Sequence, residues 1–135
     1  SAASFTFLDF PVDHEVRHQD LPSNFALKIH ALLCREYVKG RDWYDFSWYV
    51  AQGVFPNLMH LEAALRQFGP WSQNSKLAVD KAWLERELTT RIHEIDWEDA
   101  RQDVRRFLRP TDAESLALWS NRFFESKLSK LIAAD

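Results

Sequence analysis

Apolar residues recur every three or four positions over most of the chain, which is the period of an α-helix. Glycine, proline and short polar stretches separate these periodic segments. The pattern predicts helices at about 23–37, 41–52, 56–68, 80–94 and 96–108, and a last helix from 111 to the end. The expected fold is therefore mainly α, a bundle of five to six helices.

Residues near the ends of the predicted helices indicate where these helices begin and which side chains they bury. Ser23 is expected to cap the first helix, and Thr111 with Glu114 to form a capping box at the start of the last one. Tyr37 completes the apolar stripe of the first helix and Phe68 completes that of the third. Both aromatic rings are therefore expected on the packed sides of their helices.

Residues 5–20 alternate between apolar and polar positions, with Pro11 interrupting the alternation. This is the pattern of a strand or a bent pair of strands, and it is the one β signal in the sequence. A single strand leaves its backbone groups unpaired, so a preceding portion of the protein or a partner is expected to complete the sheet. The expected organisation is a residual β segment at 1–22 and a helical domain at 23–135.

Composition narrows the classes of function. With 17 Lys and Arg against 20 Asp and Glu, the net charge of -3 provides no overall attraction to nucleic acid. Cys34 is the single cysteine, which excludes an intrachain disulfide and fits a reducing compartment. No apolar run is long enough to cross a bilayer and no export signal is seen, so a cytoplasmic protein without membrane contact is expected.

The stretch 25–53 carries most of the candidate chemistry. Lys28 and Arg35 share a face of the first predicted helix, and Asp42 and Asp45 lie about 60° apart around the second. Two convergent carboxylates can hold Mg²⁺, or deprotonate and orient a hydroxyl, while neighbouring cations neutralise phosphate. The same spacing also suits a plain helical hairpin, whose exposed salt bridges contribute only about 0 to 1 kcal/mol each. Spacing alone leaves both interpretations open.

Other residues offer weaker signals. Trp43, Trp48 and Tyr49 could stack on bases, although aromatic residues at helical spacing also suit a core. The fifth predicted helix carries a basic stripe that could contact RNA or be a solvated face: Arg101, Arg105, Arg106 and Arg109. No metal site is predicted, because the histidines fall on separate elements, apart from a pair that a strand would hold about 13 Å apart, His14 and His18. Cys34 is expected to be a small buried residue rather than a nucleophile.

Several segments resemble the motifs of a known protein family in the identity of their residues as well as in their spacing. The sequence KIHALL at 28–33, then Arg35, then KGRDWYDF at 39–46 resembles the third and fourth motifs of the AbiEii-type nucleotidyltransferases, the toxins of type IV toxin-antitoxin systems. VDKAWL at 79–84 and the segment 96–104 also look like the carboxy-terminal half of such proteins. The resemblance covers most of the chain.

This resemblance implies a polymerase-β-like fold, in which a small sheet with a GS motif and a DxD carboxylate pair holds Mg²⁺ and a nucleoside triphosphate, and a helical half follows. In that scheme Lys28, Arg35 and Arg41 bind the nucleotide. Asp42 completes the active site, as a base or by positioning the acceptor, and Asp45 and Lys28 belong to the catalytic set with it. The implied partners are an antitoxin protein and, for some members, a tRNA acceptor.

The chain departs from that pattern in one respect, because it contains no GS motif followed by a DxD pair. It is therefore expected to be the carboxy-terminal half of such an enzyme, or a truncated relative, and to be inactive without the missing amino-terminal half. The alternative is a helical interaction module that binds RNA or an antitoxin without catalysis. Self-association through the unpaired strand is a third interpretation.

Overall fold

The structure is a computed structural model that describes residues 20–134. Within these residues it contains seven α-helices, one 3-10 helix and no strand. The mainly α prediction is confirmed, but the expected count of five to six helices is too low. The strand expected between residues 5 and 20, and self-association through it, lie outside the described residues and stay predictions. No helix in the described part of the chain is long and apolar enough to cross a membrane.

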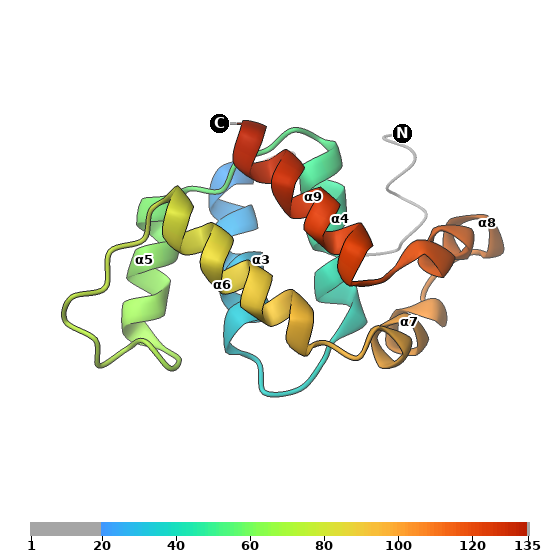
Figure 1. Ribbon diagram of the computed structural model, residues 1–135, viewed down its shortest axis with the longest axis horizontal. Coiled ribbons are helices and arrows are strands. Elements are labelled where there is room, and N and C mark those ends of the chain that lie inside the picture. The colour runs from blue at the N-terminus through green and yellow to red at the C-terminus, as the bar shows by residue number, and fades with distance from the viewer. Residues whose placement is uncertain (1–19, 135) are drawn as a thin grey trace.

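The first three helices lie in one layer. They are α3 (Leu21–Cys34), α4 (Gly40–Ala51) and α5 (Leu58–Gln67). Figure 1 shows α3 between the other two in projection, and α3 packs against both α4 and α5. The close pairing of α3 with α4 is what brings the candidate residues of the first two helices together.

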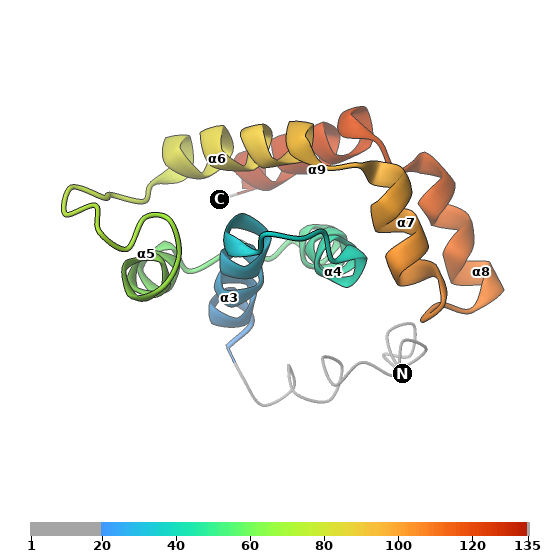
Figure 2. The ribbon, with the colours of Figure 1, turned by 90° about the horizontal axis from the view of Figure 1, so that it is seen from below.

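A second layer covers the first, and a short helical arm closes one end. Figure 2 shows α6 (Lys81–Glu94) and α9 (Asn121–Ala134) lying across the row formed by α5, α3 and α4. At the end of the row, α7 (Trp97–Arg105) packs against α4. The chain then passes through α8 (Pro110–Ala113) and the 3-10 helix Glu114–Leu118 before α9.

The core between the layers is aromatic, as the composition suggests. Phe25 of α3 stacks on Tyr49 of α4, with ring centroids 4.6 Å apart and planes at 7°. Trp43 of α4 meets Trp97 of α7 and Phe124 of α9 edge-on, at 5.1 and 5.2 Å. All five rings are buried, so α4 is held by aromatic contacts on α3, α7 and α9.

The first helix begins three residues earlier than an N-cap at Ser23 would place it. Its N-cap is Asp20, and Pro22 lies in the first turn, where a missing N–H costs no helical hydrogen bond. Ser23 Oγ instead donates to Asp20 Oδ2 at 3.1 Å. The prediction of Ser23 as the N-cap is therefore wrong.

The last predicted helix is broken into three elements. Thr111 lies inside α8, whose N-cap Arg109 forms no side-chain capping bond, so the expected box with Glu114 is absent from these residues. At Trp119 the backbone is extended, and Ser120 Oγ then accepts from the N–H of Phe123 at 3.0 Å. The break lets the Trp119 ring reach the core, where it is 3% exposed. Helical spacing does not reveal such a break, because the apolar residues on both sides still face the core.

Two aromatic residues predicted on packed helix faces lie on the surface instead. The first helix ends at Cys34 and the third at Gln67, so Tyr37 and Phe68 fall beyond them. Their exposed fractions are 62% and 67%. Phe68 has an extended backbone, with φ -152° and ψ 135°, which takes its side chain off the helical stripe. A stripe predicts burial only while the helix continues.

Candidate functional site

Lys28 and Arg35, from α3, meet Asp42 and Asp45, from α4, in one ion-paired group. Lys28 Nζ lies 3.1 Å from Asp42 Oδ1 and 3.0 Å from Asp45 Oδ2. Arg35 Nε donates to Asp42 Oδ2 at 2.5 Å. The structure therefore brings together the four charged residues that the sequence spacing singled out.

The two carboxylates are buried and the two cations reach the surface. Asp42 and Asp45 are 1% and 3% exposed, and no other polar or charged residue is buried to that degree in the described part of the chain. The side chains of Lys28 and Arg35 are 24% and 30% exposed. Two of the three Lys28 N–H groups are used by the carboxylates, which leaves the cationic side of the group facing outward.

Close packing of α4 on α7 fixes where the carboxylates lie. A Cβ on Gly40 would stand 2.1 Å from the carbonyl oxygen of Ala100, so only glycine allows this approach. The N–H of Gly40 donates to Asp103 Oδ2 at 2.7 Å, which satisfies one of the free donors at the start of α4. Asp42 follows in the first turn, where the helix dipole favours a negative charge.

Arg91 of α6 holds the end of α3 from which Arg35 projects. Its Nε donates to the carbonyl of Leu32 at 2.9 Å and its Nη2 to the carbonyl of Arg35 at 2.5 Å. These bonds satisfy main-chain acceptors that the end of a helix leaves unpaired. This contact was not predicted, because nothing in the sequence pairs an arginine with carbonyls 56 and 59 residues away.

Within this group, burial and the neighbouring opposite charges shift the pKa of each side chain in opposite directions. Burial raises the pKa of Asp45, and Lys28 opposes the rise. Burial lowers the pKa of Lys28, but Asp45 and Asp42 together outweigh it and raise that pKa above its ordinary value. Burial also lowers the pKa of Arg35, but the hydrogen bond and the charge of Asp42 outweigh it, so that the pKa of Arg35 is raised. One oxygen of the group, Asp45 Oδ1, is buried without a hydrogen-bond partner among the described residues.

Arg41 and the predicted basic stripe make different contacts. The Arg41 guanidinium lies 5.1 Å from the centroid of the Phe107 ring, and that of Arg106 lies 4.9 Å from the same ring. Arg101 donates to the carbonyl of Trp119 at 2.8 Å and pairs with Glu98, while Arg109 pairs with Asp112 at 3.2 Å. The four-arginine stripe is thus divided, with two members engaged in structural contacts and Arg105 and Arg106 exposed.

Two of the three aromatic residues considered for base stacking are buried. Trp43 and Tyr49 are 2% and 3% exposed, so the prediction that they could stack on bases is wrong. Trp48 is half-buried against Tyr49. Cys34, expected to be buried, is also half-buried, and burial raises the pKa of its thiol.

Two of the histidines that the structure describes, His30 and His93, form polar contacts with other elements of the fold. His30 Nε2 lies 3.0 Å from the carbonyl oxygen of Phe68, and His93 pairs with Glu125. In the described part of the chain, no group of three or more His, Cys, Asp or Glu residues is arranged to hold a metal ion. His14 and His18 lie outside the described residues.

Comparison with known proteins gives one match. A sequence model of the family described as "Nucleotidyl transferase AbiEii toxin, Type IV TA system" matches residues 3–125. No curated protein and no solved structure matches the chain. The matched range contains the whole ion-paired group and the helices α3 to α7.

Proposed function

The chain belongs to the AbiEii family of nucleotidyl transferase toxins of type IV toxin-antitoxin systems, and we propose that residues 20–134 provide the helical side of a nucleotide-transfer site. The family implies a nucleotide substrate and, for the complete enzyme, a divalent metal ion, and it suggests an antitoxin partner. The observation that carries the proposal is the convergence of two outward-facing cations on one buried carboxylate, Asp42.

In this proposal Lys28 and Arg35 bind the phosphates of the nucleotide. In nucleotidyl transfer an acceptor oxygen attacks the α-phosphorus, the bond from that phosphorus to the bridging oxygen breaks, and pyrophosphate leaves. Negative charge is spread over the phosphate oxygens throughout, so cations fixed beside them lower the barrier. Lys28 supplies a compact point charge and Arg35 a planar set of donors that suits phosphate oxygens.

The contacts support positioning roles for the two aspartates. Each oxygen of Asp42 already accepts from a cation, Lys28 on one side and Arg35 on the other. Asp42 is also only 1% exposed, which leaves little of its surface for an acceptor to reach. Asp45 is similarly engaged with Lys28. We therefore assign Asp42 and Asp45 to holding the two cations in place rather than to touching the substrate.

These residues do not fit a Mg²⁺ ion. The two carboxylates that would be its ligands both bind the Lys28 ammonium, and no other suitable cluster occurs among residues 20–134. The sequence contains no GS motif followed by a DxD pair. We propose that carboxylates outside this chain bind the metal. We also propose that the β segment expected at 1–22 ends before α3, which begins at Leu21, and that it forms one half of the enzyme together with the helical domain that follows. Transfer of labelled nucleotide to RNA by the 135-residue chain alone would contradict this.

The proposal is tested by the binding of inorganic tripolyphosphate, which presents phosphate without a base. Lys28→Met together with Asp45→Leu removes one cation and the carboxylate it would leave unpaired. This variant should bind tripolyphosphate at least tenfold more weakly than the wild type in titration calorimetry. Lys130→Met, an exposed cation on α9, is the control and should change the affinity less than twofold. Equal affinities in the two variants would rule out Lys28 as a phosphate ligand.

A second candidate function is RNA binding at the carboxyl end of α7. The observation that favours it is the Phe107 ring, 40% exposed and contacted by the guanidinium groups of Arg41 and Arg106. An arginine-flanked aromatic ring is suited to stacking with an unpaired base. Replacing Arg105 and Arg106 by glutamine should then weaken RNA binding and flatten its salt dependence, while the Lys28 and Asp45 double variant binds RNA normally.

A further inference from the structure

A cavity of about 420 Å³ lies at the carboxyl end of α3, next to the ion-paired group. Its lining includes Arg35 together with His30, Cys34, Tyr37 and Phe68. Arg35 therefore belongs both to the ion-paired group and to the cavity lining, since its Nε donates to Asp42 and its side chain forms part of the cavity wall. A ligand in the cavity would lie beside one of the two proposed phosphate-binding cations.

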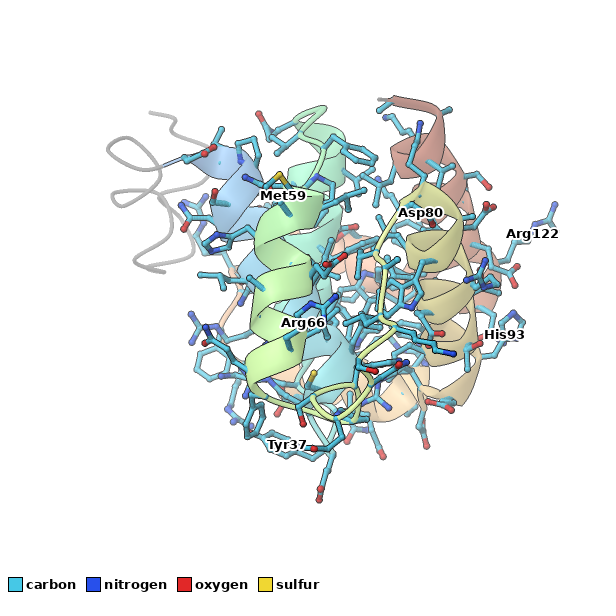
Figure 3. All side chains as sticks on the ribbon, turned by 90° about the vertical axis from the view of Figure 1, so that its left-hand side faces the viewer. Tyr37, Met59, Arg66, Asp80, His93 and Arg122 are labelled. Atoms are coloured by element: carbon cyan, nitrogen blue, oxygen red, sulfur yellow. The ribbon has the colours of Figure 1, made fainter. Side chains whose placement is uncertain are left out.

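The wall of this cavity contains two aromatic rings that are not packed in the hydrophobic core. Tyr37 and Phe68 are 62% and 67% exposed, and both line the cavity. Figure 3 shows Tyr37 near the bottom of the molecule, at the lower edge of the helices. Exposed rings gathered at a cavity favour a flat apolar ligand over solvent, because stacking removes apolar surface from water.

The backbone holds these rings where they are. The His30 ring hydrogen-bonds the carbonyl of Phe68 at 3.0 Å, which fixes the end of α5 against α3. Gly69 has a φ of 115°, and a Cβ there would stand 2.5 Å from Cys34 Sγ. The residue after Phe68 must therefore be glycine for the chain to pass this close to α3. The cavity is built by fixed contacts between α3 and the end of α5.

We propose that this cavity binds a nucleobase whose attached phosphate lies against Arg35 and Lys28. The inference rests on the proposed function, because it takes those two cations as the phosphate site. The volume lies within the range of about 300 to 1,000 Å³ usual for small-molecule sites. The two aromatic rings can stack on any of the nucleobases, and the Arg35 guanidinium can donate hydrogen bonds to the phosphate attached to that nucleoside. The base belongs either to the nucleoside triphosphate or to the end of an RNA acceptor.

The cavity does not suit the other chemistries its residues suggest. Cys34 would be a nucleophile only as a thiolate, and burial raises the pKa of its thiol. The nearest acceptor to its sulfur is the carbonyl of Phe68, at 3.8 Å, which cannot take the proton. His30, Cys34 and Glu36 all line the cavity, but they are not arranged to hold a metal ion, since no group of three or more such ligands occurs among the described residues.

The test compares ring-deleting variants of the 135-residue chain by titration calorimetry. Phe68→Leu and Tyr37→Leu keep an apolar side chain but remove the ring, while Tyr37→Phe keeps the ring and removes the hydroxyl that contacts Arg35. Leu118→Ala, an exposed apolar residue away from the cavity, is the surface control. The ligands are the four nucleoside triphosphates, the four nucleosides, inorganic tripolyphosphate and a short single-stranded RNA.

We expect at least one nucleoside triphosphate to bind the wild type tighter than tripolyphosphate, and each leucine variant to lose about tenfold of that affinity. Leu118→Ala should stay within twofold of the wild type, Tyr37→Phe should bind that triphosphate more tightly than Tyr37→Leu does, and Phe68→Leu should leave tripolyphosphate binding unchanged. Loss of affinity for the RNA alone would assign the base to the acceptor. Unchanged affinity of the leucine variants for every ligand would overturn the inference.

The two proposals fail separately. If tripolyphosphate does not bind but nucleosides bind in a ring-dependent way, the phosphate site is wrong and the base site stands. If tripolyphosphate binds through Lys28 and no base adds to that affinity, the phosphate site stands and the base site is wrong.

Discussion

Helix α4 joins two regions of opposite chemical character. One side of it carries Asp42 and Asp45, buried against the cations of α3, and the other carries Trp43 and Phe46 in the aromatic core. The aromatic side lowers the free energy of the folded state by removing large apolar surfaces from water. The charged side must overcome the loss of hydration of two carboxylates, and buried ion pairs often contribute nothing net to stability. A group that does not stabilise the fold calls for another role, which supports the functional interpretation of the charged side.

The largest effect is expected on the aromatic side. Trp43→Ala removes a ring that is 2% exposed and contacts rings on α7 and α9. We expect the free energy of unfolding in urea to fall by about 3 to 5 kcal/mol, the usual cost of deleting a buried tryptophan side chain. Leu118→Ala, 64% exposed, should cost less than about 0.5 kcal/mol. A loss below 1 kcal/mol for Trp43→Ala would mean that the aromatic side does not hold α4.

The charged side should respond differently to single and paired changes. Lys28→Met leaves Asp45 buried without its cation, and we expect it to lower the free energy of unfolding by about 3 kcal/mol. Adding Asp45→Leu removes the unpaired carboxylate and should restore most of that loss, because Asp42 keeps Arg35. Urea denaturation of both single variants and the double variant forms a double-mutant cycle. If the double variant is less stable than Lys28→Met, the pair is a source of stability and the comparison between the two sides of α4 breaks down.

The junction between the two regions is Gly40, at the start of α4. Gly40→Ala places a methyl group 2.1 Å from the carbonyl oxygen of Ala100, and helix α7 must move to admit it. We expect a loss of about 1 to 3 kcal/mol in the free energy of unfolding, as for other overpacked sites. Tripolyphosphate binding should weaken as well, since the same movement displaces Asp42. Gly53→Ala is the matched control, because a Cβ there meets no atom within 4 Å and only its φ of 74° is unfavourable. A change confined to stability would show that α7 does not position the site.

The sequence was sufficient to predict the meeting of the four charged residues. Lys28 and Arg35 are seven residues apart on one predicted helix and the aspartates three apart on the next. In the structure Arg35 is the C-cap of α3, and a short connection joins α3 to α4. Helical spacing and this short connection together predict that the four side chains meet. The burial of the two aspartates was not predictable, because it depends on tertiary packing around α3 and α4 that helical spacing does not specify.

Two of the wrong predictions have a common cause. Tyr37 and Phe68 were both placed by continuing a helical period past the residue where the helix ends, and the last predicted helix was continued in the same way across the break at Trp119. The stops depend on contacts from elsewhere in the chain, such as the His30 bond to the Phe68 carbonyl and the Arg101 bond to the Trp119 carbonyl. Sequence periodicity carries no information about such contacts, and the cavity proposed to bind a base was missed for that reason.

The smallest effect is expected for a change at Arg91, which tests whether this residue positions Arg35 or only stabilises the fold. Arg91→Lys keeps the positive charge, but a single ammonium cannot reproduce two guanidinium bonds to the carbonyls of Leu32 and Arg35. We expect a loss of about 1 kcal/mol in the free energy of unfolding, the usual value of one lost hydrogen bond. Tripolyphosphate affinity should fall severalfold, because the Arg35 main chain is then free to shift away from Asp42. Lys130→Met, which also changes a cation on the second layer, should leave both quantities unchanged. If Arg91→Lys lowers stability but keeps the wild-type tripolyphosphate affinity, Arg91 serves only to cap α3, and Arg35 is held in place by Asp42 alone.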